Sequence, residues 1–304
     1  MRMNRLTIGM MAGFLCLAGT VFSQTETNHL PVITLKTRLP NDEETAFPYR
    51  VPANYDPKGR EVHRVLINCV WQTTVFDRWA DEHGAFILHA IFKDPRCWKV
   101  KDGFGQVILD GLQKLKKEYR VAADQIFVYG ISRGGQLSSF LVSWKPELVT
   151  AWISHIPGIM DEPNLRMKDI PGIVTAGEGD DGRYQVGTRF MEQARKLHLT
   201  VIWRSYANAG HEVPGEAIEM SKAFFTFHHE RTKDILQRGR SRFASNPDAA
   251  LTKPRFVGDA QEWKYFPVES DEARGILEEH RVELPTEEIA RVWTERESVA
   301  ESME

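Results

Sequence analysis

The stretch "QIFVYGISRGGQ" at residues 125–136 decides the expected fold, because it combines a strand, a tight turn and the start of a helix. An apolar run at 126–129 has the length and β-branched or aromatic composition of a buried strand. Gly130 and Gly134 flank Ser132, and glycine avoids a side-chain clash where strand and helix meet closely. The pattern predicts that Ser132 is raised above a sheet. A glycine-rich helix start without a catalytic role fits the same letters, so other loops must supply the partners of a nucleophile.

Apolar segments of strand length alternate with segments of helical periodicity on both sides of this turn. The predicted strands cover residues 64–70, 85–92, 125–130, 149–158, 170–177 and 199–206, after extended segments at 32–36 and 47–51. The predicted helices cover residues 75–84, 105–120, 134–146, 184–197 and 214–229. Such alternation is typical of a mostly parallel sheet with helices on both faces. In these sheets the chemistry lies at the carboxyl ends of the strands.

Two further loops at that edge carry the residues that a serine nucleophile requires. His211 lies in "NAGHEV", after the last predicted strand, and can act as the base. Asp180 lies in "AGEGDDG", after the preceding strand, and can orient the imidazole and stabilise its protonated form. Asp181 and Glu178 are neighbouring alternatives for the acid. The amide of Arg133, at a helix N-terminus, is a candidate donor to a developing oxyanion.

With these three motifs in this order, the sequence resembles the α/β-hydrolase superfamily. The elements that carry the resemblance are "GISRGG", "GEGDDG" and "AGHE". More narrowly, "YRVPANYDP", "WADEHGAFIL" and "YGISRGGQLSSFL" look like exported esterases related to polyhydroxybutyrate depolymerases and feruloyl esterases, over about residues 47–229. The resemblance implies Ser132 as nucleophile, Asp180 as acid and His211 as base. It implies no metal or organic cofactor.

One loop departs from the family pattern. The family usually has a His-Gly pair after the strand that here reads "VLINCVWQ", where Asn68 and Cys69 stand instead. The second oxyanion donor is then expected to be the backbone amide of Val70 or Trp71. Loss of one oxyanion donor costs about 10²–10³ in rate. This altered loop is the feature that favours a rival hypothesis, a non-catalytic binding protein on the same scaffold.

Other charged and polar residues have a structural and a functional interpretation. His155 ends a predicted strand and is expected to be structural, with a place in the site as the alternative. Arg133 and Arg183 could face an acidic substrate, but solvated arginines are the simpler interpretation. The pair at 228–229 is expected to be solvent-facing at a helix end rather than a metal site. Only about 15 residues separate the strands ending near Ile156 and starting near Gly172, which leaves no room for a large lid and predicts an open cleft.

Composition narrows the function class. The chain has 304 residues, 42% of them hydrophobic, which suffices for one well-filled core. The formal net charge of −3 argues against a nucleic-acid partner, because phosphate binding needs a basic patch. The expected partner is a small-molecule or polymer-linked ester, with no membrane association after the leader is removed.

The N-terminus is typical of an export signal. Arg2 and Arg5 precede the uncharged apolar stretch 6–17, and Val21 and Ser23 are small enough for a cleavage site. We expect residues 1–23 to be a signal peptide and the mature protein to be periplasmic or extracellular; an uncleaved anchor is the alternative. In an oxidising compartment Cys69 and Cys97 could form a disulfide, and free buried thiols are equally compatible with the sequence.

The pattern changes after about residue 230. The stretch 238–256 is polar and contains proline, whereas Trp263, Tyr265 and Phe266 follow soon after. "LPTEEIARVWTE" predicts a short helix with Thr286 as N-cap. Because a disordered tail rarely carries such aromatic residues, we expect residues 231–304 to pack on a hydrolase domain spanning 31–230. A partner-binding arm is the alternative.

Overall fold

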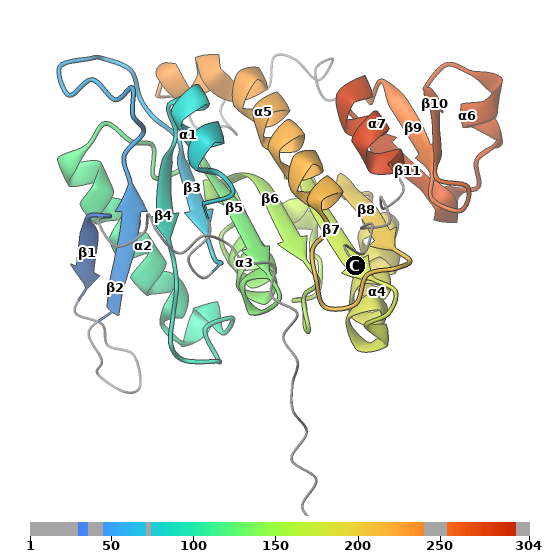
Figure 1. Ribbon diagram of the computed structural model, residues 1–304, viewed down its shortest axis with the longest axis horizontal. Coiled ribbons are helices and arrows are strands. Elements are labelled where there is room, and N and C mark those ends of the chain that lie inside the picture. The colour runs from blue at the N-terminus through green and yellow to red at the C-terminus, as the bar shows by residue number, and fades with distance from the viewer. Residues whose placement is uncertain (1–29, 36–44, 71–73, 240–253, 296–304) are drawn as a thin grey trace, which may run out of the picture.

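The computed structural model describes residues 30–35, 45–70, 74–239 and 254–295. Its centre is an eight-stranded sheet with the order β1-β2-β4-β3-β5-β6-β7-β8 (Figure 1). The strands are β1 Val32–Leu35, β2 Thr45–Arg50, β3 Val65–Asn68, β4 Phe86–His89, β5 Ile126–Ile131, β6 Val149–His155, β7 Gly172–Gly177 and β8 Val201–Tyr206. The pairings β1–β2 and β2–β4 are antiparallel, and all others in this sheet are parallel.

Helices cover both faces of the sheet and divide the core in two. The helices are α1 Asp77–His83, α2 Phe104–Glu118, α3 Arg133–Trp144, α4 Asp181–Lys196 and α5 Gly215–Gln237, with short 3-10 helices at Val100–Asp102, Pro146–Leu148 and Leu165–Met167. One buried cluster contains apolar residues of α2, α3 and α4, and the other contains those of α1 and α5. Strands β3, β4 and β7 are buried at every position, as expected for parallel strands covered on both faces.

The predicted helices differ from the observed ones mainly at their ends. Helix α1 ends at His83, and its C-cap is Gly84. Gly84 has φ 61°, a left-handed conformation that glycine adopts at low cost. Helix α4 begins three residues earlier than expected, because Asp180 caps it by accepting a hydrogen bond from the backbone amide of Arg183. The candidate acid is therefore also a helix cap.

The expectation for His228 and His229 was wrong. Helix α5 does not end at 229 but continues to Gln237, and both imidazoles are buried at 3% exposure. His228 packs on Phe224, with ring centroids 4.4 Å apart. Burial, together with the charge of Arg64 and other nearby basic groups, lowers the pKa of His229 to about 3. These residues are part of the core between α5 and its neighbours.

A second, smaller sheet follows α5 and lies beside β8 (Figure 1). Its strand order is β10-β9-β11, all antiparallel, with β9 Phe256–Asp259, β10 Lys264–Pro267 and β11 Arg281–Leu284. Helices α6 Asp271–Gly275 and α7 Glu287–Thr294 complete it, with a 3-10 helix at Glu278–His280. Thr286 caps α7 by accepting from the amide of Ile289, as its sequence predicts.

Residues 254–295 contact the main body through α7 and β11. Helix α7 packs on α5, and β11 lies against β8. Trp293 is fully buried and donates its indole N–H to the carbonyl oxygen of Trp203. The guanidinium of Arg204 lies 3.9 Å from the ring centroid of Trp263. Trp293 is therefore part of the core, and Trp263 and Tyr265 are partly buried against it.

Two expectations fall outside the described part of the chain. The signal peptide at 1–23 lies entirely there, as does Trp71. Within the described residues, we find no helix with both the length and the apolar character that crossing a bilayer would require.

Candidate active site

Ser132 occupies the turn between β5 and α3, in a backbone conformation rare for a residue with a side chain. Its φ of 55° and ψ of −116° lie in a sparsely populated region, which costs about 1–3 kcal/mol and persists at functional sites. Ser132 is at the N-cap position of α3, yet its hydroxyl makes no capping hydrogen bond. The hydroxyl is directed elsewhere, so the alternative of a plain glycine-rich helix start does not describe this turn.

The two flanking glycines are required by close backbone contacts. A Cβ at Gly130 would lie 2.0 Å from the carbonyl oxygen of Gly134, and a Cβ at Gly134 would lie 1.9 Å from that of Cys69. Real Cβ atoms do not approach backbone oxygens so closely. The glycines therefore let the turn close against α3 on one side and against the loop after β3 on the other.

The three residues inferred from the sequence meet at the carboxyl ends of β5, β7 and β8. Ser132 Oγ lies 3.0 Å from His211 Nε2, and His211 Nδ1 lies 3.2 Å from Asp180 Oδ2. Both distances allow hydrogen bonds in which the serine hydroxyl donates to one imidazole nitrogen and the other nitrogen donates to the carboxylate. The imidazole thus lies between a hydroxyl and a carboxylate, which is the geometry of a general base with an orienting acid.

The alternatives for the acid make other contacts. Glu178 accepts from the hydroxyl of Ser205 at 2.6 Å, and Asp181 accepts from the side-chain amide of Gln185 at 3.0 Å. Gly177 permits the approach of the histidine loop, since a Cβ there would lie 2.3 Å from the carbonyl oxygen of Gly210. Asp180 is therefore the carboxylate that the fold places against His211.

The Asp180 carboxylate is held in its charged form. Burial acts to raise its pKa, but hydrogen bonds from the backbone and side chain of Arg183, with the arginine's charge and that of His211, together lower the pKa below its ordinary value. Arg183 Nη1 lies 2.8 Å from Asp180 Oδ2. A solvated side chain was the simpler expectation for this arginine, so its ion pair with the candidate acid is a feature that the sequence analysis missed. The i, i+3 spacing across a helix start was the available signal.

The candidate oxyanion donors differ in whether their amides already have a hydrogen-bond partner. The amide of Arg133 is in the first turn of α3, where backbone N–H groups have no partner within the helix. The amide of Val70 donates to Asn68 Oδ1 at 3.2 Å, and the Asn68 side-chain nitrogen lies 3.2 Å from His89 Nδ1. Trp71 lies outside the described residues. The Val70 amide must therefore break its hydrogen bond to Asn68 before it can donate to an oxyanion.

His155 is structural, in agreement with its expected role. It is fully buried, with Nδ1 2.7 Å from the hydroxyl oxygen of Thr175 and Nε2 3.0 Å from that of Ser221. Burial lowers its pKa to about 3. Its carbonyl oxygen accepts the amide of Ser132 at 2.8 Å, so it supports the turn from below.

The two cysteines near the site are free and buried. Burial raises the pKa of both thiols, that of Cys97 to about 11. A thiol rather than a thiolate is a poor nucleophile, so neither cysteine competes with Ser132 for that role. Among the residues that the structure describes, no group of three or more His, Cys, Asp or Glu side chains is arranged to hold a metal ion.

The site is open to solvent. The His211 side chain is 47% exposed, and that of Asp180 is 17% exposed. Between β6 and β7, residues 156–171 contain a single 3-10 turn, Leu165–Met167, and no helical lid. The predicted absence of a large lid in this segment is confirmed.

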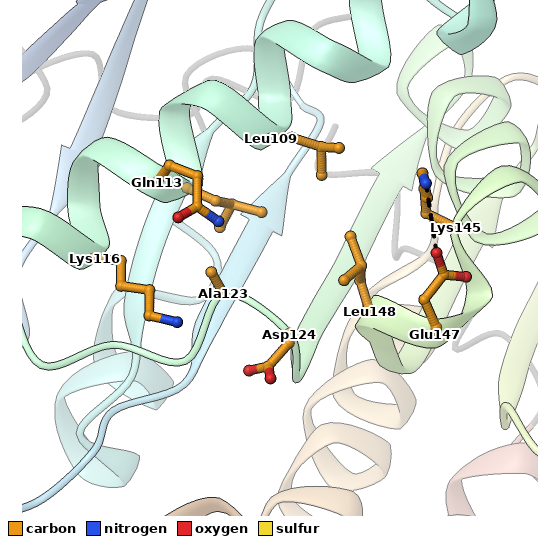
Figure 2. Close-up of a pocket in the computed structure, with 9 residues that line it drawn as sticks. Leu109, Gln113, Lys116, Ala123, Asp124, Lys145, Glu147 and Leu148 are labelled. Carbon is orange, nitrogen blue, oxygen red and sulfur yellow. Dashed lines mark ion pairs between the residues drawn. The ribbon is translucent and has the colours of Figure 1, made fainter. Parts of the chain in front are cut away.

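A surface pocket lies away from this site. Figure 2 shows it between α2 and the 3-10 helix Pro146–Leu148, with Leu109 and Leu148 on its apolar wall and an ion pair between Lys145 and Glu147. Asp124 and Lys145 precede β5 and β6, so the pocket is at the amino ends of these strands, opposite the triad. It contains none of Ser132, Asp180 and His211.

Comparison with solved structures identifies the fold. The sequence matches no family model and no curated protein. A thermostable esterase aligns over 71% of this chain and 64% of its own, with a TM-score of 0.50 and 15% identity. A Rhizomucor miehei esterase aligns over 67% and 83%, with a TM-score of 0.50 and 10% identity. An acylaminoacyl peptidase aligns over 65% and 41%, with a TM-score of 0.51 and 15% identity. This chain has the α/β-hydrolase fold.

The α/β-hydrolase fold predicted from the sequence is thus confirmed. At these identities the likeness extends to the fold alone. This α/β-hydrolase chain covers 64% of the length of the thermostable esterase and 41% of that of the acylaminoacyl peptidase, in both cases less than two thirds. The narrower resemblance to polyhydroxybutyrate depolymerases and feruloyl esterases remains a prediction.

Proposed function

We propose that this protein is an exported serine hydrolase that cleaves carboxylic esters. The observation that carries the proposal is the continuous contact from the hydroxyl of Ser132 through the imidazole of His211 to the carboxylate of Asp180. A serine hydroxyl is a weak nucleophile at neutral pH unless an adjacent base removes its proton. These three side chains come from loops separated by up to 79 positions, so the tertiary fold rather than the local sequence brings them together.

In the proposed mechanism, His211 Nε2 removes the proton of Ser132 as Oγ attacks the ester carbonyl carbon. The tetrahedral oxyanion receives hydrogen bonds from the amide of Arg133 and from that of Val70 or Trp71. The imidazolium then protonates the leaving alcohol, and an acyl-enzyme remains. His211 next removes a proton from water as the water attacks the acyl carbon, and returns that proton to Ser132 Oγ as the bond to the serine breaks and the acid is released. Asp180 stabilises the imidazolium in both halves.

Several features support bulky or polymer-linked esters as substrates. The imidazole is nearly half exposed, and the β6–β7 segment has no helical cover. An open site accepts an ester that is attached to a large group, because the remainder of the substrate can stay in solvent. Peptides and thioesters are the alternatives within the same chemistry, since the triad does not encode the leaving group.

The experiment that tests the enzyme proposal is active-site labelling. A fluorophosphonate probe should label the wild-type protein and not Ser132→Ala. Ser139→Ala is the matched control, because the Ser139 hydroxyl donates to the carbonyl of Gln136 in the same helix and should not affect labelling. A panel of esters, thioesters and amides then identifies the bond that is cleaved.

The competing function is a binding protein that has kept the scaffold. The hydrogen bond from the Val70 amide to Asn68 favours it, because this bond occupies a candidate oxyanion donor. Absence of labelling in folded wild-type protein would support the binding protein and reject the enzyme. The proposal of export is tested separately, by the N-terminal residue of the protein recovered outside the cytoplasm, which we expect to be Gln24.

A further inference from the structure

Arg183 makes the shortest contact to the candidate acid. Its Nη1 atom lies 2.8 Å from Asp180 Oδ2, and its backbone amide donates to Asp180 Oδ1 at 3.4 Å. The arginine side chain is 32% exposed and that of Asp180 17%, so the pair is more protected than a fully exposed surface ion pair. Both carboxylate oxygens therefore have a partner on Arg183.

The oxygen that binds the guanidinium is also the oxygen that binds the imidazole. His211 Nδ1 lies 3.2 Å from Asp180 Oδ2, the atom that Arg183 Nη1 approaches. The two donors share one acceptor atom, and the arginine is the closer of the two. A displacement of this oxygen therefore changes both contacts.

The arginine is itself held in place by the fold. It belongs to the first turn of α4, and its guanidinium lies over Gly158 in the β6–β7 segment. A Cβ added at Gly158 would lie 3.8 Å from Arg183 Nη2 and 2.8 Å from the side-chain nitrogen of Gln136. Arg183 thus lies between the acid loop, the β6–β7 segment and α3, close to the serine turn.

The other charged groups around Asp180 and His211 have separate partners or none nearby. Glu178 accepts from Ser205, Asp181 from Gln185, and the Glu212 carboxylate from the amide of Gly210. Arg133, beside the serine, is exposed and forms no ion pair within the described chain. Arg183 is therefore the cation that acts on this carboxylate from within the described residues.

We propose that Arg183 is a positioning residue for the catalytic acid: it fixes the Asp180 carboxylate against His211 and, through the shared oxygen, limits how strongly that carboxylate stabilises the imidazolium. This inference rests on the proposed function. It predicts two separable effects of removing the guanidinium. The carboxylate loses its fixed orientation, which lowers the rate, and the imidazolium loses a nearby positive charge, which favours the protonated base.

The direction of the pH effect follows from the charge. Removal of a cation near the imidazole stabilises the protonated form of His211, which cannot act as a base. The acid limb of kcat/KM should therefore move to higher pH in Arg183→Met. Arg183→Lys should leave that limb near its wild-type position, because lysine keeps the charge and the observed contact uses a single nitrogen, Nη1.

The test compares kcat/KM against pH for the wild-type protein and these two variants. We expect Arg183→Met to lose about 10- to 100-fold at neutral pH, as misplacement of a catalytic group does, and Arg183→Lys to recover most of that loss. Arg166→Met is the matched control. Arg166 makes an ion pair of the same length, 2.8 Å, with Glu147, away from the triad, and its removal should change neither rate nor profile.

A second readout separates this inference from the proposed function. The Nδ1 proton of His211 should give a downfield NMR resonance whose position differs between wild type and Arg183→Met, whether or not the protein turns over substrate. An unlabelled, inactive wild-type protein would reject the proposed function alone. A folded Arg183→Met variant with the wild-type pH profile and an unmoved resonance would overturn the role of Arg183.

Discussion

Trp293 donates its indole N–H to the carbonyl oxygen of Trp203 at 2.7 Å, which joins the C-terminal segment to β8 across 90 positions of sequence. Strand β8 is the last strand of the main sheet. An edge strand exposes unpaired backbone groups that favour association with other chains. The C-terminal segment lies beside this edge, so its contacts protect the strand as well as bury the indole.

Truncation of Trp293 should destabilise the whole protein. Trp293→Ala should lower the free energy of unfolding by about 3–5 kcal/mol, because a fully buried aromatic side chain leaves a cavity. Urea denaturation measures the change. Leu277→Ala is the control: this side chain is 59% exposed, and its loss should cost less than about 0.5 kcal/mol. Equal, small effects in the two variants would show that the C-terminal segment is not docked in solution.

Alanine at Gly134 should be poorly tolerated. The added Cβ would overlap the backbone oxygen of Cys69 at 1.9 Å, and backbone cannot move aside cheaply. We expect a loss of about 3 kcal/mol or more of unfolding free energy, together with loss of fluorophosphonate labelling. Gly215→Ala is the matched control, since nothing lies within 4 Å of its new methyl group. That variant should be neutral or up to about 1 kcal/mol more stable. A stable, labelled Gly134→Ala protein would contradict the described contact.

The proposed catalytic role of Asp180 can be separated from its capping of α4 by substitution. Asp180→Asn keeps a good N-cap for α4 but removes the charge that orients His211, so kcat should fall by about 10⁴ with little change in stability. Asp180→Ala should lose the same activity and also about 1 kcal/mol of unfolding free energy. Parallel kinetic and denaturation measurements distinguish the variants. An active Asp180→Asn protein would assign the acid to another residue.

Buried neutral histidines should make the fold sensitive to mild acid. Burial lowers the pKa of His155 to about 3, and burial with the charge of Arg50 lowers that of His89 to about 4. A histidine in the unfolded chain titrates near 6.5, so below about pH 6.5 the unfolded state binds more protons and stability falls. The loss continues until the pH reaches the folded-state pKa. Each such group contributes at most about 1.4 kcal/mol per pH unit.

Denaturation at pH 7.5 and pH 5 tests this expectation. His155→Gln should reduce the difference in unfolding free energy between the two pH values. His198→Asn, which changes an exposed histidine, should leave the difference as in the wild type. An unchanged difference in His155→Gln would show that His155 is not a source of the acid sensitivity.

The sequence predicted those features that depend on local pattern and chain order. Gly130 and Gly134 indicated the turn at Ser132, because only glycine fits such close backbone contacts. The order of strands placed Asp180 and His211 at the same edge, because carboxyl ends of parallel strands lie together. What remained hidden depended on contacts between distant segments.

The burial of the 228–229 pair is one example. Its environment is set by the elements that pack around α5, and the helical periodicity of residues 214–229 carries no record of them. The ion pair of Arg183 with Asp180 is another, because its value to the site depends on His211, which lies 31 positions from Asp180 in the chain.

The strained backbone at Ser132 has a consequence for engineering. Glycine would relax a φ of 55° and ψ of −116° at this position, so substitution to glycine should make the protein harder to unfold while removing its proposed nucleophile. A screen that selects only for thermal tolerance would therefore discard the reactive hydroxyl. Serine at this position gives up conformational stability and places a hydroxyl against His211 instead.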